Sequence, residues 1–311
     1  MKIFNSIHEF SSTAKTIITL GTFDGVHKGH ASILRKIISN SRALGYESVV
    51  LTFFPHPRMV LQQNSAIKLL STMEEKAQLL ESYELDNLVI HPFDIEFSRL
   101  TAEEFVKDVL VDRLNIHKVI IGHDHRFGRN RTANIDDLIR FGNEYGFEVE
   151  KISALSVNEV SVSSTKIRNA LTAGDITTAN DFLGYPYFLT GTVVKGKQLG
   201  RTIGFPTANM HIKEDYKLIP ANGVYTVSSE IDGKIVYGMM NIGVRPTVEG
   251  TSLSIEVHFL DLDKNLYDAR MCIAIHHRLR DEQKFESFDA LKLQLYKDRE
   301  DTIAYFKKHK V

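Results

Sequence analysis

Cysteine is almost absent from this chain, because Cys272 is the only one among 311 residues. An internal disulfide and a cysteine-based zinc site are therefore excluded, and so sparing a use of cysteine fits a reducing compartment. Long apolar runs are also missing, since no stretch approaches the roughly 18 uninterrupted apolar residues of a membrane-spanning helix. The first ten residues contain Glu9 and have no apolar core, which argues against a signal peptide. We expect a cytoplasmic protein with no membrane partner.

An excess of charge of one sign is lacking as well. The 38 basic and 39 acidic side chains leave a formal charge of −1, and neither half of the chain is basic enough to hold a nucleic-acid backbone by counterion release. We expect no nucleic-acid partner, although a small polyanion such as ATP needs only a few well-placed cations. The content of 43% hydrophobic and 25% charged residues is ordinary for a folded protein. The length, about twice that of a common domain, predicts two domains.

In the first half of the chain, short β-branched runs alternate with helical patterns. The pattern predicts an α/β doubly wound sheet, with ligands at the carboxyl ends of its strands. The expected strands are 16–20, 48–54, 88–90 and 118–121, and the expected helices are 31–43, 72–82, 101–114 and 135–145. Thr101 and Glu104 form a capping box at the start of the third helix. We place the end of this domain at residue 184, so that it spans 1–184.

The second domain, 185–311, has short alternating segments separated by turn signals such as Asp232-Gly233. This pattern predicts an antiparallel β-barrel followed by a terminal helix from about 288 to 308. The expected strands are 188–194, 223–229, 235–242, 253–259 and 271–276. The residues expected on one face of the terminal helix are Phe288, Leu291, Leu295, Ile303 and Phe306.

A glycine-rich loop directly follows the first expected strand. Residues 21–30 read GTFDGVHKGH, and the three glycines allow tight turns and a close approach to a ligand. A helix begins at the end of the loop, and the free N–H groups of a helix N-terminus suit phosphates. His27 and His30 share one face of its first turn, where they can clamp a reacting phosphate. The alternative is a glycine turn with two solvated histidines; a metal site is disfavoured because no third ligand is near.

A second glycine loop, rich in lysine and arginine, occupies residues 195–204. It leads to Thr207 and Asn209, which lie two residues apart on one side of the chain and offer oxygen ligands that suit Mg²⁺. On the expected strand 253–259, Glu256 lies on the face opposite the apolar residues, where it can accept a proton from a substrate hydroxyl. The loop is not a Walker A loop and is not expected to open a helix. The alternatives are a solvated hairpin and a solubilising glutamate.

The H-x-G-H spacing in the first loop resembles the signature of the nucleotidyltransferase superfamily, and the full run GTFDGVHKGH resembles the bacterial FAD synthetases. Residues 54–57 (FPHP), 122–129 (GHDHRFGR) and 163–168 (SSTKIR) resemble further segments of that family. The resemblance implies a Rossmann-like nucleotidyltransferase domain that transfers the adenylyl group of ATP to FMN. It implies catalytic roles for His27, His30 and Arg168. The implied ATP or phosphate contacts are Gly21, Phe23, Gly25, Gly29, Ser163, Ser164 and Thr165, and the implied flavin contacts are Phe54, His56, Pro57, Asp124, Arg126 and Phe127. Residues 131–136 depart from the family pattern, which leaves their backbone path open.

In the second half, GRTIGFPTAN at 200–209 resembles the GFPTAN motif of the riboflavin kinases. GVY at 223–225, NIGVRPT at 241–247 and RLRDEQKF at 278–285 resemble further segments of that family. The resemblance implies that Glu256 is the catalytic base and that Thr207 and Asn209 hold Mg²⁺. The implied phosphate contacts are Lys195, Gly196, Gly200, Arg201, Gly204 and Pro206, and the implied flavin contacts are Arg278 and Glu282.

Together the two resemblances cover nearly the whole chain, which is identified as a member of the bifunctional riboflavin kinase/FMN adenylyltransferase family. This implies riboflavin, FMN and ATP as substrates, FAD as final product and Mg²⁺ as cofactor, in a monomer or a weak homo-oligomer. The alternatives are a transferase with one active half and a non-catalytic flavin-binding protein. A dinucleotide-binding oxidoreductase is disfavoured because GTFDGV lacks the G-x-G-x-x-G spacing.

Overall fold

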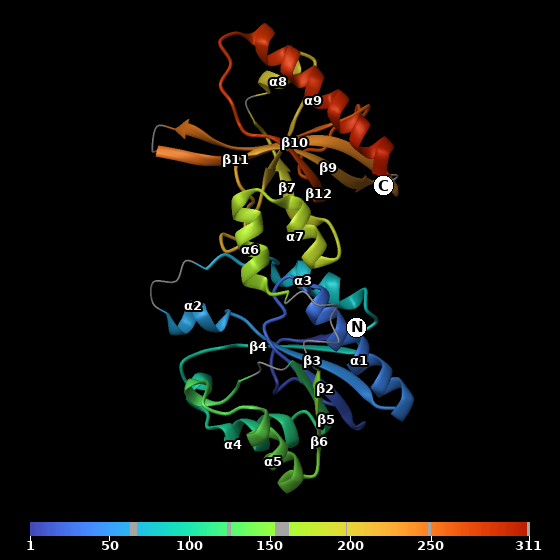
Figure 1. Cartoon of the computed structure of the whole chain (residues 1–311), viewed down its shortest axis with the longest axis vertical. Helices are drawn as coiled ribbons and strands as arrows, with labels where there is room; N and C mark the ends of the chain where they lie inside the picture. The colour runs from blue at the N-terminus through green and yellow to red at the C-terminus, as the bar shows by residue number, and fades with distance from the viewer. Residues whose placement is uncertain (63–66, 123–125, 153–161, 197, 248–249, 310–311) are drawn as a thin grey trace. The chain divides into compact units, whose positions relative to one another are not determined.

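The structure, a computed structural model, describes residues 1–62, 67–122, 126–152, 162–196, 198–247 and 250–309 (Figure 1). It consists of two compact units, Met1–Ser164 and Thr165–Val311. The division precedes the domain end predicted at residue 184, because α7 (Ile176–Leu183) packs against β7 (Tyr187–Val194) and β12 (Arg270–Arg280) of the second unit.

The first unit is built on a six-stranded sheet in which each neighbouring pair of strands is parallel, with the order β1-β4-β3-β2-β5-β6. The strands are β1 (Lys2–Phe4), β2 (Thr16–Leu20), β3 (Glu47–Phe53), β4 (Asn87–His91), β5 (Ile116–Gly122) and β6 (Glu148–Ile152). The doubly wound sheet is thus confirmed, and the four predicted strands are β2 to β5. The outer strands β1 and β6 have no counterpart among the predicted ones.

The helices of this unit are α1 (Lys28–Leu44), α2 (Pro57–Leu61), α3 (Met73–Glu81), α4 (Ala102–Glu104) and α5 (Ile135–Tyr145), with short 3-10 turns at Phe97–Arg99 and Arg129–Arg131. The prediction of one regular α-helix over 101–114 is wrong in the type of helix. The capping box of Thr101 and Glu104 is present, but α4 continues as a π-helix over Phe105–Val111. This wider winding buries four apolar residues together: Phe105, Val106, Val109 and Leu110.

The two faces of the sheet have separate apolar cores, because successive strand residues point to opposite sides. Ile18 packs in one cluster with Phe141 of α5, whereas the next residue back, Ile17, packs in another with Leu34 of α1 and Leu80 of α3. All five residues of β2 are buried. A strand covered on both faces reads as a continuous apolar run, which explains why β2 was predictable.

The order of the strands reverses beside β2. From β2 the chain runs outward through β3 and β4 on one side, and β5 and β6 lie on the other side. In open parallel sheets, ligands bind outside the carboxyl ends of the strands at such a switch point. The loop that follows β2, which carries the predicted phosphate residues, therefore begins where the topology favours a ligand.

The second unit is a closed antiparallel barrel with the order β10-β11-β8-β7-β12-β9, as predicted. Besides β7 and β12, its strands are β8 (Ala208–His211), β9 (Gly223–Ile231), β10 (Lys234–Thr247) and β11 (Gly250–Phe259). Its helices, besides α7, are α6 (Ser164–Ala173), α8 (Leu199–Thr202) and α9 (Phe288–His309). The short strand β8, which has no counterpart among the predicted strands, closes the barrel between β11 and β7.

The terminal helix α9 contacts β10 and β12 of the barrel (Figure 1). Phe306 is buried, and its ring stacks on that of Tyr237 at 3.9 Å. Phe288, Leu291 and Leu295 of the predicted face line one cavity between α9 and the barrel, although Phe288 is 66% exposed. The buried polar residues Asp298 and Thr302, which were not predicted, also belong to the packed face.

A buried histidine between α9 and the barrel predicts a pH-dependent stability. His276 packs edge-on to Phe306, its Nε2 lies 2.8 Å from Ser228 Oγ, and burial lowers its pKa from 6.5 to about 4. Between these two values the unfolded chain binds the proton and the folded chain does not, so stability falls as the pH falls below 6.5. At pH 5 the loss is about 2 kcal/mol relative to pH 7.5. Urea unfolding at both pH values measures it; His276→Gln removes this share of the loss, and an equal loss in the variant would contradict the assignment.

Candidate active sites

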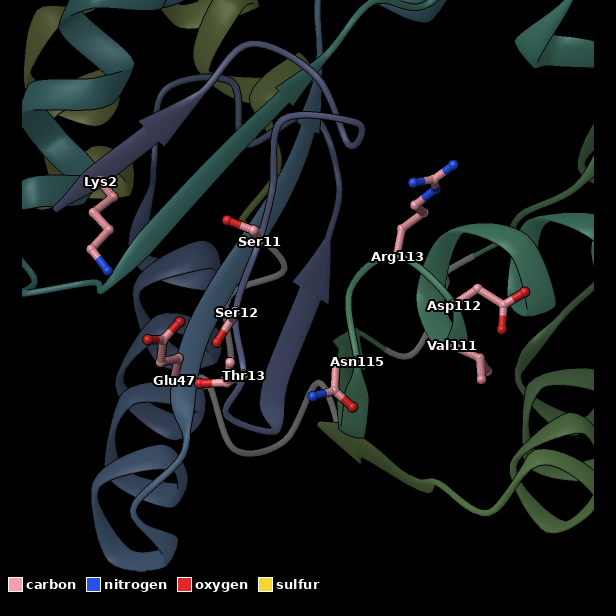
Figure 2. A pocket seen from close by; sticks show the side chains of 9 residues that line it. All are labelled: Lys2, Ser11, Ser12, Thr13, Glu47, Val111, Asp112, Arg113 and Asn115. Atoms are coloured by element: carbon pink, nitrogen blue, oxygen red, sulfur yellow. The ribbon is translucent and has the colours of Figure 1, made fainter.

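A cavity of about 560 Å³ lies at the amino ends of the parallel strands (Figure 2). It is lined by Lys2, Ser11, Ser12, Thr13, Glu47, Val111, Asp112, Arg113 and Asn115. Its two cationic and two anionic side chains balance. Glu47 Oε2 accepts from Asn87 Nδ2 at 3.0 Å, and Asn115 Nδ2 donates to the Ala14 carbonyl at 2.9 Å. Parallel sheets bind ligands at the opposite end, outside the carboxyl ends of their strands. The active site of this unit is therefore expected at the carboxyl ends.

The loop between β2 and α1 turns sharply at the carboxyl end of β2. The N–H of Gly21 still donates to Leu51 C=O at 3.1 Å, and then three residues take left-handed backbone angles: Phe23 (φ 47°), Gly25 (φ 81°) and Val26 (φ 36°). Such angles cost non-glycine residues free energy and cluster at functional sites. The predicted glycine turn is therefore present. The side chain of Phe23 is only 2% exposed and packs in the core, and its predicted phosphate contact stays a prediction.

His27 and His30 are brought together as predicted. His27 is the N-cap of α1, and its Nδ1 accepts from the N–H of His30 at 3.4 Å. The two rings stack at 3.7 Å with 14° between their planes, and the ring of Phe23 covers His30 at 4.7 Å. Gly29 makes this stack possible, because a Cβ there would lie 3.1 Å from the His27 ring. His30 Nδ1 is buried and has no hydrogen-bond partner within the described ranges.

Burial keeps the His30 side chain uncharged near neutral pH. Burial, the neighbouring His27 and the ammonium of Lys76 together hold the pKa of His30 well below its ordinary value of 6.5. The imidazole is therefore neutral near pH 7 and supplies N–H donation rather than a standing positive charge. Sequence could not reveal this, because the desolvation that removes the charge exists only in the fold.

Several side chains hold the loop between β2 and α1 in place by hydrogen bonds. The buried Asp24 carboxylate accepts from the N–H groups of Leu70 and Ser71, at 2.9 and 3.2 Å. Ser71 Oγ in turn accepts from Gly25 N–H at 3.2 Å, and Ser164 Oγ donates to Asp24 C=O at 2.9 Å. Of the predicted SSTKIR residues, Ser164 thus contacts the loop directly, and Asp24 was not singled out by the sequence.

The remaining predicted hydroxyls and Arg168 belong to the start of α6. Ser163 immediately precedes this helix, and Thr165 and Arg168 lie within it. Ser164 and Arg168 are four residues apart and share a helix face. Thr165 and Arg168 are part of the second compact unit, and their predicted phosphate contacts stay predictions.

The predicted flavin residues of the first unit follow β3 and β5. His56 is the N-cap of α2, with its Nδ1 accepting from Arg58 N–H at 3.1 Å, and Phe54 and Pro57 flank it. Arg126 is exposed, and Asp124 lies outside the described residues. Phe127 is only 7% exposed and belongs to the core, so its flavin contact stays a prediction. The backbone left open at 131–136 leads to an Asn134–Asp137 capping box that starts α5.

Three aromatic rings at the carboxyl ends of β3 and β4 escaped the sequence analysis. The ring of Phe53 lies 5.8 Å from that of Phe93 and 5.5 Å from that of Phe97, and all three are half-buried. Phe97 also meets the His91 ring at 4.5 Å. Scattered phenylalanines give no signal in a sequence, because only the sheet brings the strand ends together.

The second unit contains a cavity of about 330 Å³ between the barrel and α9. Its wall combines apolar side chains with polar and charged ones in similar number, so that it can hold both the apolar and the polar parts of a small molecule. It is lined by Gly200, Ile203, Phe205, Thr207, Val224, Met239, Asn241, Ser254, Glu256, His258, Arg280, Glu282, Gln283, Phe285, Phe288, Leu291, Leu295 and Asp298. Glu256, Thr207, Gly200 and Glu282 were all predicted site residues.

Glu256 lies on β11 opposite Asn209 of β8, and Thr207 Oγ1 donates to Glu256 Oε2 at 3.3 Å. The predicted face of β11 is confirmed: Ile255 and Val257 are buried, and Glu256 is half-buried on the cavity side. Leu253, predicted with the apolar face, is 50% exposed. Strand register pairs Asn209 with Glu256, and a hydrogen bond joins Thr207 to Glu256, so the three residues predicted for this site lie next to one another.

The basic glycine loop contains a helical turn that was not predicted. Gly200 and Arg201 belong to α8, which the Phe205 N–H closes by donating to Gly200 C=O at 2.8 Å. Lys195, at the start of the loop, and Arg201, within α8, are exposed, and Gly204 follows α8 with φ 86°. The Pro206 carbonyl is 2.8 Å from His258 Nδ1, which ties the loop to β11. Gly196 is required, because a Cβ there would overlap the side-chain amide of Asn209.

Arg278 does not line the cavity, although it was predicted to contact the flavin. Its Nη2 donates to Asn222 C=O at 2.6 Å, and its guanidinium packs against Gly174 and Gly223. A register shift between Arg278 and Arg280 turns the second arginine to the cavity instead. Because the bulge falls between two residues that would otherwise share a face, sequence spacing could not distinguish them.

Arg280 forms a buried, two-pronged ion pair with α9. Its Nε and Nη2 donate to the two carboxylate oxygens of Asp298 at 2.9 and 2.7 Å, and Gln294 Nε2 donates to the same carboxylate at 2.9 Å. Asp298 is only 1% exposed. Removing one partner of a buried pair leaves an uncompensated charge, so this pair fixes α9 over the cavity. Neither residue was a predicted site residue.

These two units define a class: a nucleotide-binding α/β unit followed by a small-molecule-binding barrel. The sequence matches the FAD synthetase family over residues 9–166 and the riboflavin kinase family over residues 183–306. The bifunctional riboflavin kinase/FMN adenylyltransferase of Escherichia coli (strain K12) is 36% identical over 303 residues, covering 96% of each chain. The Listeria monocytogenes protein of that name is 38% identical over 294 residues, which cover 94% of this chain and 93% of the relative. This chain belongs to the bifunctional riboflavin kinase/FMN adenylyltransferase family.

A solved structure agrees in fold over nearly the full length. A crystal structure described as a macrolide-efflux protein from Streptococcus pneumoniae has a TM-score of 0.88 and 30% identity, and covers 96% of this chain and 97% of its own.

None of the helices in the described part of this chain combines the length and the hydropathy needed to cross a membrane.

Proposed function

We propose that this chain makes FAD from riboflavin in two ATP-dependent steps at two separate sites. The barrel cavity phosphorylates riboflavin to FMN, and the loop after β2 transfers the adenylyl group of a second ATP to FMN, releasing pyrophosphate. The proposal rests on one observation: a carboxylate, Glu256, lies on the wall of a cavity that combines apolar and polar side chains, and its Oε2 accepts a hydrogen bond from the Thr207 hydroxyl at 3.3 Å. We assign the adenylyl transfer to a first domain of residues 1–184 and the phosphorylation of riboflavin to a second domain of residues 185–311.

In the kinase step, the terminal ribityl hydroxyl of riboflavin attacks the γ-phosphate of ATP. A neutral alcohol is a weak nucleophile, and Glu256 takes its proton as the bond forms. The apolar wall, which includes Phe205 and Met239, suits a flat flavin ring, and Glu282 lines the same cavity. Lys195 and Arg201 at the ends of the glycine loop meet the phosphates of ATP and offset the charge that develops on them.

Magnesium fits the oxygen cluster beside Glu256. Thr207 donates its proton to Glu256, so the lone pairs of its hydroxyl stay available to a cation, and Asn209 adds an amide oxygen. No group of three or more His, Cys, Asp or Glu side chains in the described segments can hold a metal ion by itself, so a magnesium ion held by Thr207 and Asn209 would need further oxygen ligands, which the phosphates of ATP would supply. When bound, Mg²⁺ neutralises charge on the transferred phosphoryl group.

In the transferase step, the phosphate of FMN attacks the α-phosphate of ATP. This nucleophile is already an anion, so no general base is needed, and the task is to stabilise a crowded, negative transition state. His27 and His30 donate N–H groups there, beside the N-terminus of α1, and Arg168 with Ser163, Ser164 and Thr165 holds the departing pyrophosphate. Phe54, His56, Pro57, Asp124 and Arg126 contact the flavin, and the half-buried rings of Phe53, Phe93 and Phe97 offer it an apolar surface.

The proposal is tested by incubating the pure chain with riboflavin, ATP and Mg²⁺ and separating the flavins by chromatography. FMN is expected first and FAD later, with ADP and pyrophosphate released in step. Removing Mg²⁺ with EDTA stops the kinase step, and returning Mg²⁺ restores it. Riboflavin that stays unchanged would favour a non-catalytic flavin-binding protein, and FMN without FAD would favour a single active half. The cytoplasmic location and the monomeric or weakly oligomeric state stay predictions.

A further inference from the structure

A lysine is buried next to the loop between β2 and α1. It lies outside the motifs that the sequence analysis identified. Lys76 lies on α3 and is only 3% exposed. Its Nζ donates to the Thr22 carbonyl at 2.7 Å, and from the opposite element, β3, Thr52 Oγ1 donates to the same oxygen at 3.2 Å. Thr22 is the second residue of the loop after β2, so its carbonyl is drawn inward by two donors.

Burying an ammonium group costs free energy that a leucine at the same place on α3 would not cost. Burial accordingly lowers the pKa of Lys76 to about 8, and the opposite charge of Asp24 only partly offsets this effect. The folded chain thus keeps the ammonium of Lys76 buried despite its cost in free energy. The residues around this ammonium indicate what it acts on.

The charged groups that face Lys76 come from two elements. Asp24 in the loop raises the pKa of Lys76, and Lys76 adds to burial and His27 in lowering the pKa of His30 on α1. On its own helix, the carboxylate of Glu75 is engaged with the N–H of Thr72 at 2.9 Å in the capping box. The ammonium therefore acts on the loop and on the histidine that meets the nucleotide.

We propose that Lys76 is a positioning residue for adenylyl transfer, which fixes the Thr22 carbonyl inward and so holds the start of the loop after β2 in place. A carbonyl that turned outward would present its negative end to the phosphates and repel them. The inference rests on the adenylyl transfer proposed for this loop.

Two variants on the same carbonyl test the inference in the full-length chain. Lys76→Met removes the charge and its hydrogen bond, whereas Thr52→Val removes the neutral donor alone. We expect Lys76→Met to lower kcat/KM for the conversion of FMN to FAD about 10- to 100-fold, and Thr52→Val to lower it less. In NMR titrations, the pKa of His30 rises in Lys76→Met and stays at the wild-type value in Thr52→Val. The formation of FMN from riboflavin is unchanged in both.

The inference is overturned if Lys76→Met matches Thr52→Val in both rate and His30 titration, because the lysine would then be one hydrogen bond among others. If Lys76→Met does not fold, the inference is tested by comparing the pH dependence of adenylyl transfer in the wild type and in Lys76→Arg. Adenylyl transfer in the wild type falls as the pH rises through about 8, where Lys76 loses its proton, and Lys76→Arg, which keeps its charge, lacks this fall. Identical profiles would overturn the inference. A wild type that makes no FAD refutes the proposed function itself, which is a different result.

Discussion

Replacing Glu256 by glutamine is expected to slow the formation of FMN from riboflavin about 10²- to 10⁴-fold and to leave the conversion of supplied FMN to FAD unchanged. The size follows from the loss of a general base beside a neutral alcohol. Glutamine keeps the shape of the side chain and can still accept the proton of Thr207, which lies 3.3 Å from the carboxylate. Initial rates of both steps, measured by chromatography of the flavins, separate the two effects.

Glu230→Gln is the matched control, because Glu230 is an exposed glutamate on the barrel strand β9 and does not line the cavity. Both activities should match the wild type in that variant. Loss of FAD formation from supplied FMN in a folded Glu256→Gln chain would show that Glu256 serves both sites, which the proposed division of roles forbids.

The second large effect is expected for His30→Ala, which should lower the conversion of FMN to FAD about 10²- to 10³-fold, the usual cost of one donor to a transition-state oxyanion. The formation of FMN should continue at the wild-type rate, so FMN accumulates from riboflavin. Because His30 is neutral near pH 7, owing to its burial and to its neighbours His27 and Lys76, the loss is that of an N–H donor. His30→Gln, which keeps a donor, should retain part of the rate.

His8→Ala is the control for that experiment, since His8 is an exposed histidine of the same unit that belongs to neither site. It should leave both rates unchanged. If His30→Ala made FAD at the wild-type rate, the stacked histidines would have no part in the transfer.

The predictable parts of the fold are those whose local sequence matches their environment. The strand β2 is buried on both faces and is continuously β-branched or apolar, and the capping residue Thr101 precedes Glu104 by the spacing that a capping box needs. The strands without a prediction are short or lie at an edge: β1 has three residues and β8 four. So short a segment has no periodicity, and only its partner strand makes it a strand.

The predictable parts of the sites are those set by chain spacing, and the rest depends on burial and register. His27 and His30 meet because they are three residues apart at a helix start. Arg280 lines the cavity because a bulge separates it from Arg278, and nothing in the sequence marks that bulge. Lys76 follows two glutamates on a helix, a pattern typical of an exposed face, yet it is buried. Its charge, like that of His30, depends on a desolvation that only the fold creates.

One measurement tests the central claim, that the two steps have separate and complete sites. Glu256→Gln and His30→Ala chains are incubated with riboflavin, ATP and Mg²⁺, first alone and then mixed. Alone, the first should leave riboflavin almost unchanged and the second should stop at FMN. The mixture should make FAD, because FMN released by one chain is adenylylated by the other. A mixture that makes no FAD, from variants that each keep their remaining activity, would contradict the account.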